Sequence, residues 1–159
     1  MALGAKVTAV TASAEKADVL RRLLGCDVLV AAEAEFASLL AGRGEFDCVF
    51  DALGGGYSEA CLRRVRIGGR HLIVGFAAGA IPRVSLDLVT QRQVRVAGVS
   101  WGGWVQANRT VQHALYSQLF DLWRDEKIMR MPVQTLALDN FAQAFSSMQH
   151  RMQPAKSCL

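Results

Sequence analysis

Hydrophobic residues occur along the chain in short runs separated by amphipathic stretches, and this alternation predicts strands and helices in regular succession. The predicted strands cover residues 6–12, 27–30, 46–52, 70–76 and 94–99. The predicted helices begin near Ser13 or Ala14 and stop at Gly25, and then cover residues 33–41, 57–65 and 86–90. Four or five β-α units of this kind predict an α/β fold with a doubly wound, mostly parallel sheet. The strand at 46–52 is interpreted as a continuous apolar strand that is covered on both faces.

The pattern changes after Trp101-Gly-Gly-Trp104. Residues 106–124 have apolar positions at helical spacing, which predicts one long helix. A strand at 132–136, a helix at 139–150 and a terminal strand at 155–159 are predicted to follow it.

Two of the predicted strands run into glycine-containing turns. The strand at 46–52 leads into Leu53 and the glycines 54–56, and the strand at 70–76 leads through Gly75 to Gly79. Glycine lets a backbone approach a flat or phosphorylated ligand closely, and ligands of open α/β sheets bind beyond the carboxyl ends of the strands. These turns predict half of a nucleotide site. A G-x-G-x-x-G phosphate loop, which would form the other half, does not occur in residues 1–28.

The composition is that of one soluble domain. The 159 residues are 52% hydrophobic and 20% charged, which allows a sizeable core and argues against disorder. The net charge of +4 is carried by scattered basic residues, the densest group being Arg63, Arg64, Arg66 and Arg70. Because this group neither forms a basic run nor alternates with aromatic residues, we expect an anionic small ligand and no nucleic acid.

The cysteines and the N-terminus bear on the compartment. Cys26, Cys48, Cys61 and Cys158 form no C-x-x-C pair and have no histidine at metal-ligand spacing, so we expect small core residues, no disulfide and no metal. No apolar run reaches the about 18 residues of a membrane helix, and no secretory signal pattern opens the chain. The sequence therefore favours a cytoplasmic protein that does not bind membranes, with import into an organelle left open.

Three ordered motifs carry a family resemblance: Asp51-Ala-Leu-Gly-Gly, the run from Gly68 to Pro82, and Gly98-Val-Ser-Trp-Gly. With residues 2–16 and the ending Arg151-Met-Gln-Pro-Ala-Lys, they resemble the medium-chain dehydrogenase/reductase superfamily, most closely its zinc-independent NADPH:quinone oxidoreductase branch. The resemblance covers nearly the whole chain and implies a Rossmann-like fold. It departs from the branch within the ending, where alanine stands in place of the usual glycine.

The resemblance also implies what precedes this sequence in family members: a substrate domain, the first strand and the glycine-rich loop. Residues 1–130 are accordingly predicted to be an incomplete dinucleotide-binding domain, and residues 131–159 a segment that in the family packs on the substrate domain. In the strand order 3-2-1-4-5-6 the first strand is central, so its neighbours are expected to lack a partner. Whether Met1 is a natural start is left open.

The second strand of that family reads the adenosine ribose, and here no Asp or Glu stands at its end to bind a 2′-hydroxyl. Thr11, Ser13 and Lys16 can instead donate to a 2′-phosphate, so the resemblance implies NADPH in preference to NADH. The alternatives are a solvated Lys16 and a Ser13 that only caps the helix. Ala31 and Ala32 occupy the place where branch members often carry a phosphate-binding tyrosine.

The turns after the next two strands would line the ribose and the nicotinamide. The resemblance assigns this role to backbone groups of Leu53, Gly54, Gly75, Phe76 and Ala77. The alternative is that these glycines are only turn residues.

The same resemblance places Val99 and Trp101 at the carboxamide end of the nicotinamide and Arg151 at the cofactor phosphates. The alternatives are an interface or core aromatic for Trp101 and an exposed helix-end arginine for Arg151. His71 is interpreted as a packed histidine rather than a base, and Asp51 as a cap for the next helix. No residue of the chain is predicted to be catalytic.

Two functions follow from these patterns. The first is the cofactor-binding portion of an NADPH-dependent quinone or activated-alkene oxidoreductase, inactive by itself. The alternative is a non-catalytic, truncated product that associates through exposed sheet edges, with itself as a homo-oligomer or with a full-length relative. A methyltransferase-like nucleotide domain would need an acidic residue near the end of the strand at 6–12, and none is present.

Overall fold

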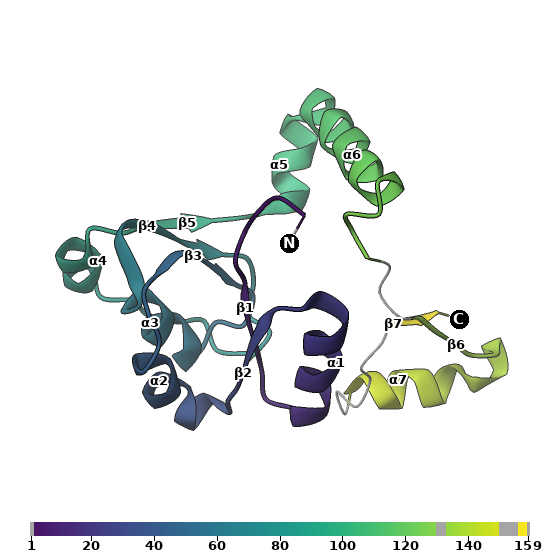
Figure 1. The fold of residues 1–159 in the computed structure, drawn as a ribbon, viewed down its shortest axis with the longest axis horizontal. Coiled ribbons are helices and arrows are strands. Elements are labelled where there is room, and N and C mark those ends of the chain that lie inside the picture. The colour runs from purple at the N-terminus through teal and green to yellow at the C-terminus, as the bar shows by residue number, and fades with distance from the viewer. Residues whose placement is uncertain (1, 130–132, 150–155, 159) are drawn as a thin grey trace. The chain divides into compact units, whose positions relative to one another are not determined.

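A computed structural model describes residues 2–129, 133–149 and 156–158 of the chain. It has the predicted α/β fold, with parallel strands in three sheets of order β1-β2, β3-β4-β5 and β6-β7 (Figure 1). The chain divides into two compact units, which are described separately. The first unit comprises Met1–Val30 and Leu115–Leu159, and the second comprises Ala31–Ala114.

The first unit opens with a β-α-β segment. Strands β1 (Thr8–Thr11) and β2 (Asp27–Val30) pair in parallel and are joined by helix α1 (Ala14–Leu24). Ser13 begins the helix, because its side chain accepts a hydrogen bond from the backbone N–H of Lys16. Gly25 ends it with φ 59°, a conformation that glycine adopts without strain. Both predicted helix boundaries are therefore confirmed.

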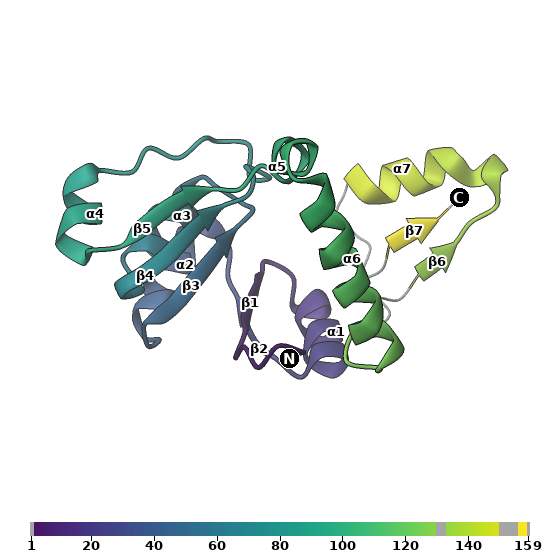
Figure 2. The same cartoon turned by 90° about the horizontal axis from the view of Figure 1, so that it is seen from above.

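The C-terminal elements belong to the first unit as well. They are β6 (Val133–Thr135), the 3₁₀ turn η1 (Leu138–Asn140), α7 (Phe141–Gln149) and β7 (Lys156–Cys158), and β6 pairs with β7 in parallel. This is the predicted order of strand, helix and strand. Figure 2 shows this β-α-β arrangement of β6, α7 and β7 from above.

The second unit holds the larger sheet. Its elements are α2 (Glu33–Ala41), β3 (Phe46–Asp51), α3 (Gly56–Leu62), β4 (Val65–Ile73), α4 (Leu86–Arg92), β5 (Arg95–Gly98) and α5 (Trp101–Ala107). Leu62, Val65, Leu88 and Val94 form its buried core. Phe36 packs α2 on α3, since it is only 1% exposed and its ring lies 5.0 Å from that of Tyr57.

The predicted helix at 57–65 is too long, and the predicted strand at 70–76 begins too late. Helix α3 ends at Leu62, and β4 already starts at Val65. The pairing with β3 jumps from Phe46↔Val65 to Cys48↔Arg70, so β4 bulges between these two contacts. Gly69 permits the bulge, because a Cβ there would lie 2.9 Å from the carbonyl oxygen of Asp47.

The predicted helix at 106–124 is divided in the structure. Asn108 ends α5, and its side-chain Nδ2 donates to the carbonyl oxygen of Trp104 at 2.8 Å. Helix α6 then runs over Arg109–Arg124. The amide of Asn108 competes with regular helical hydrogen bonding, which explains a break that periodicity does not predict.

Two burial predictions are wrong. Strand β3 is covered on one face only, because Phe50 is 70% exposed while Asp51 on the opposite face is buried. The three cysteines whose side chains the structure describes are not core residues: Cys48 is exposed, and Cys26 and Cys61 are partly exposed and form no disulfide. The side chain of Cys158 lies outside this description. In the described ranges, no helix combines the length and the apolar character needed to cross a membrane.

Candidate functional site

The turns that follow β3 and β4 are joined by backbone hydrogen bonds. The N–H of Ala77 donates to the carbonyl of Ala52 at 3.0 Å, and the N–H of Ala78 donates to the carbonyl of Leu53 at 2.8 Å. In the opposite direction, the N–H of Gly55 donates to the carbonyl of Ala80 at 3.0 Å. The two turns therefore form one rigid rim at the carboxyl ends of neighbouring parallel strands.

Gly54 is the point of closest approach between these turns. A Cβ at this position would lie 2.9 Å from Cδ1 of Phe76, 3.0 Å from the carbonyl oxygen of Ala80 and 3.3 Å from Cα of Phe76. Its φ is also positive, at 72°. Glycine is required here for both reasons, and the predicted residues Leu53 and Gly54 are brought against Gly75, Phe76 and Ala77.

Asp51 holds the first turn from below. Its Oδ1 accepts hydrogen bonds from the N–H groups of Leu53 at 3.0 Å and Gly54 at 2.9 Å. Its Oδ2 accepts from Oγ of Ser58 at 2.5 Å and lies 3.1 Å from Nε2 of His71. Asp51, Ser58 and His71 are all buried. Asp51 and the predicted packed histidine, His71, are thus two parts of one buried polar cluster. The prediction that Asp51 caps the next helix is wrong, because its carboxylate binds the turn before α3, whose N-cap, Gly55, has no side-chain cap hydrogen bond.

The carboxylate of this cluster is charged at neutral pH. Burial by itself would raise the pKa of Asp51, but hydrogen bonds from the Gly54 amide, Ser58, His71 and the Leu53 amide outweigh burial and lower the pKa below its ordinary value. With Nε2 of His71 donating to Asp51, Nδ1 is left without a hydrogen-bond partner among the described residues. The geometry therefore places a proton of His71 on Nε2.

The end of β5 lies beside this rim and extends it. The N–H of Val99 donates to the carbonyl of Ile73 at 2.8 Å, which places Val99 beside the end of β4. Trp101 opens α5, is 49% exposed and stacks on Trp104 with 5.5 Å between ring centroids. Seven predicted contact residues therefore follow three adjacent strands of one sheet.

Several backbone N–H groups of this rim already donate hydrogen bonds within the protein, and this limits which ligands the rim can bind. The amides of Leu53 and Gly54 donate to Asp51, the amide of Gly56 donates to Glu33 Oε1 at 2.5 Å, and the amide of Ala77 donates to a carbonyl. These groups do not form an open nest for a phosphate. The rim suits an uncharged, flat ligand portion, which would meet backbone carbonyls and apolar atoms.

The predicted adenosine-end residues lie at the β1–α1 junction of the first unit. The hydroxyl oxygen of Thr11 accepts from the N–H of Ser13 at 3.2 Å, and that of Ser13 accepts from the N–H of Lys16 at 3.3 Å. Both hydroxyl protons remain able to donate, and Lys16 is half-buried at the first turn of α1. Two hydroxyls and an ammonium group at a helix N-terminus fit a phosphate group. Arg151 lies outside the described residues.

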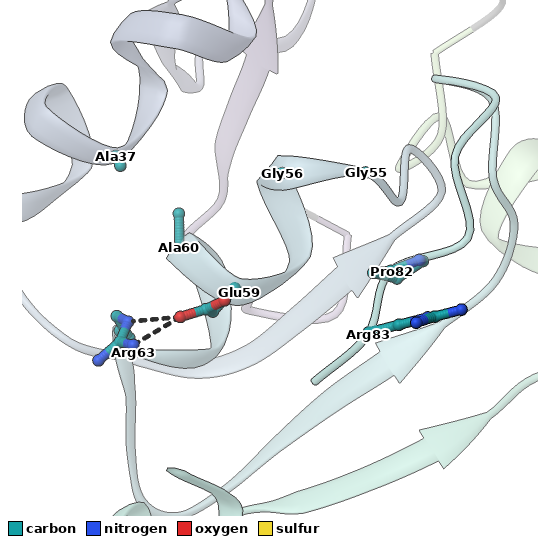
Figure 3. Close-up of a pocket in the computed structure, with 8 residues that line it drawn as sticks. All are labelled: Ala37, Gly55, Gly56, Glu59, Ala60, Arg63, Pro82 and Arg83. Atoms are coloured by element: carbon teal, nitrogen blue, oxygen red, sulfur yellow. Dashed lines mark hydrogen bonds and ion pairs between the residues drawn. The ribbon is translucent and has the colours of Figure 1, made fainter. Parts of the chain in front are cut away.

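A cavity of about 250 Å³ lies beside the same glycine turn. Its lining residues are Ala37, Gly55, Gly56, Glu59, Ala60, Arg63, Pro82 and Arg83. Figure 3 shows Arg63 paired with Glu59 at one end, while Arg83 extends away from them. Because its charged groups do not converge, this cavity is a poor match for an anionic ligand.

Two residues of the site carry no sequence signal strong enough to predict them. Ser58 reaches Asp51 only because the turn before α3 folds back over the strand end. Glu33 comes from α2 and binds the N–H of Gly56, 23 positions later in the chain. A serine in the first turn of a helix and an acid at a helix start are both common, so neither pattern indicates the long-range contact.

Cys61 provides a check on the cluster. Burial, and then the negative charge of Asp51, raise the pKa of Cys61 to about 12. Iodoacetamide at neutral pH is therefore expected to alkylate the exposed Cys48 first and to leave Cys61 unmodified in the folded chain. Peptide mass spectrometry measures both, with the urea-unfolded chain as the control in which both react. Equal labelling in the folded chain would contradict this environment.

Known proteins resemble both the sequence and the fold. The zinc-binding dehydrogenase family matches residues 1–117. Quinone oxidoreductase-like protein 2 of Bos taurus is 28% identical over 125 residues, which are 79% of this chain and 36% of the bovine protein. A quinone oxidoreductase from Pseudomonas syringae superposes with a TM-score of 0.76 and 23% identity, over 98% of this chain and 49% of that one. CurA from Vibrio vulnificus, solved in complex with NADPH, gives a TM-score of 0.73 and 17% identity over 97% and 49%. The chain spans about half or less of the length of each.

Proposed function

Because the chain belongs to the zinc-binding dehydrogenase family, within the medium-chain dehydrogenase/reductase superfamily, and corresponds to the C-terminal part of its members, we propose that it binds NADPH for an oxidoreductase reaction. The observation that carries this proposal is the hydrogen-bonded rim at the ends of β3 and β4, continued by Val99 at the end of β5. Open α/β sheets bind their ligands at this edge.

The nicotinamide half of the cofactor is assigned to this rim. Ribose hydroxyls and the carboxamide NH₂ are hydrogen-bond donors, and they complement a rim whose own N–H groups are largely committed within the protein. Phe76 is 42% exposed and Trp101 is 49% exposed, so aromatic surface is available for a flat ring.

The adenosine half is assigned to Thr11, Ser13 and Lys16, and Arg151 is proposed to contact the phosphates. None of Thr11, Ser13 and Lys16 is acidic, so none of them offers a carboxylate to a 2′-hydroxyl. All three can donate to a 2′-phosphate. We therefore propose that the site prefers NADPH to NADH. Bound NADPH supplies the hydride that would reduce a quinone or an activated alkene.

Lys16→Ala is expected to weaken NADPH binding about tenfold, because one charge-assisted contact to the 2′-phosphate is lost. NADH has no 2′-phosphate, so its affinity should stay within about twofold. Isothermal titration calorimetry measures both. Arg22→Ala, which removes an exposed cation from the other end of α1, is the matched control and should leave both affinities unchanged. Equal weakening of NADPH and NADH binding by Lys16→Ala would contradict the assignment.

The chain is proposed to be inactive by itself. Its described residues include no group of three or more His, Cys, Asp or Glu side chains placed to hold a metal ion. The proposed role is accordingly to hold and orient the cofactor, with no step assigned to a bound zinc ion. The unpaired Cys26, Cys48 and Cys61 support the proposal of a reducing, cytoplasmic setting.

A second candidate function is association. In the structure β1 pairs with β2 and β3 pairs with β4, so each of β1 and β3 has one edge without a strand partner among the described residues. Such edges favour pairing with another chain, as a homo-oligomer or with a longer relative. Size-exclusion chromatography with light scattering distinguishes the two functions: a monomer that binds NADPH supports the first, and an oligomer indifferent to NADPH supports the second.

A further inference from the structure

We propose that Asp51 is a positioning residue that fixes the nicotinamide end of the site, an inference that rests on the proposed function. Asp51 does not face the rim, because its carboxylate is buried beneath the turn. It acts through the backbone of Leu53 and Gly54, whose two N–H groups it binds at 3.0 and 2.9 Å.

Only an ionised carboxylate accepts from every donor in this cluster. Oδ1 accepts two backbone N–H groups, and Oδ2 accepts the Ser58 hydroxyl and the His71 Nε2–H. A side-chain amide can replace Oδ1, but it places an NH₂ group where Oδ2 accepts two bonds. The identity of residue 51 therefore matters beyond its shape.

Leu53 links the position of the turn after β3 to that of the turn after β4. Its N–H is held by Asp51 Oδ1, and its carbonyl accepts from the N–H of Ala78. The space between Gly54 and Phe76 would not hold even a Cβ on Gly54, so the first turn cannot move towards the second alone. A loosened Asp51 would displace both turns of the rim, while the β1–α1 junction, which lies in the first unit, contains none of these bonds.

D51N is expected to fold, because His71 can move its proton to the unpartnered Nδ1 and accept from the new amide through Nε2. A shift of the His71 tautomer in ¹⁵N NMR spectra would report this change. The expected functional effect is selective. D51N should weaken NADPH binding at least about tenfold, the cost of one charge-assisted bond, and leave adenosine 2′,5′-bisphosphate within about twofold, because that fragment lacks the nicotinamide half.

Calorimetric titration of wild type, D51N and Ser58→Ala with NADPH and with adenosine 2′,5′-bisphosphate tests the inference. Asp47→Asn, at an exposed residue of the same strand, is the matched control and should behave as wild type. Ser58→Ala removes one of the four bonds and should weaken NADPH alone, by a smaller factor, which keeps the test decisive if D51N unfolds.

The outcomes separate the two proposals. Selective loss of NADPH binding in D51N or Ser58→Ala supports the positioning role. Equal loss of both ligands, or no loss in either variant, overturns it and leaves the NADPH site standing. If the wild-type chain binds neither ligand, the proposed function itself fails and the inference fails with it.

Discussion

Phe36→Ala is expected to lower the free energy of unfolding of the second unit by about 3–5 kcal/mol, the usual cost of deleting a fully buried phenyl ring. Phe36 is 1% exposed and contacts the ring of Tyr57, so it holds α2 against α3. The removed ring leaves a cavity between two short helices.

Urea unfolding followed by circular dichroism measures this loss. Leu39→Ala is the matched control, because Leu39 lies in the same helix and is 43% exposed. It should cost less than about 1 kcal/mol, in keeping with its partial burial. If both substitutions cost the same, α2 does not pack through Phe36 and the placement of Glu33 beside the glycine turn is wrong as well.

Gly54→Ala is expected to destabilise the chain by about 2–5 kcal/mol and to abolish measurable NADPH binding. Two penalties combine: a positive φ costs about 1–2 kcal/mol for an alanine, and forcing a methyl group into a filled space costs about 1–3 kcal/mol. The methyl would press on Cδ1 of Phe76 at 2.9 Å and on the carbonyl oxygen of Ala80 at 3.0 Å, so the two turns would have to separate.

Gly79→Ala separates the two penalties. Gly79 also has a positive φ, 95°, but a Cβ there would meet nothing within 4 Å. Its substitution should cost about 1–2 kcal/mol, the φ penalty alone, and should retain NADPH binding. Equal stability and equal affinity in the two variants would show that the turns do not approach each other as described.

The sequence predicts the elements best where local signals are strong. Ser13 and Gly25 mark the ends of α1 by capping, and the structure confirms both. The sequence-based boundaries are wrong between α3 and β4, because the bulge around Gly69 depends on pairing with β3 rather than on local preference. The prediction that both faces of the strand holding Phe50 are covered is wrong for a related reason. The residues of a strand do not by themselves indicate whether other elements cover both of its faces.

In the candidate site, too, the sequence predicts the features with local signals and misses the contacts that depend on packing. The glycine turns at the ends of two strands are evident from the sequence, since parallel topology brings their residues together. The bonds from Ser58 and His71 to Asp51 join positions 7 and 20 residues away, and those contacts come from the packing of α3 and β4. The interpretation of His71 as a packed residue is confirmed. The interpretation of Asp51 as a cap for the next helix is wrong, because its carboxylate binds the turn before α3 and no side chain caps that helix.

The most direct test of the central claim is an NADPH titration of the ¹⁵N-labelled chain followed by two-dimensional NMR. We predict saturable shifts in the amides of the rim, Leu53, Gly54, Gly75, Phe76 and Ala77, together with those of Thr11, Ser13 and Lys16. NADH is expected to shift the rim amides as well, with weaker affinity. A well-folded chain whose amides do not respond to excess NADPH, or respond only outside these two groups, would contradict the proposed cofactor site.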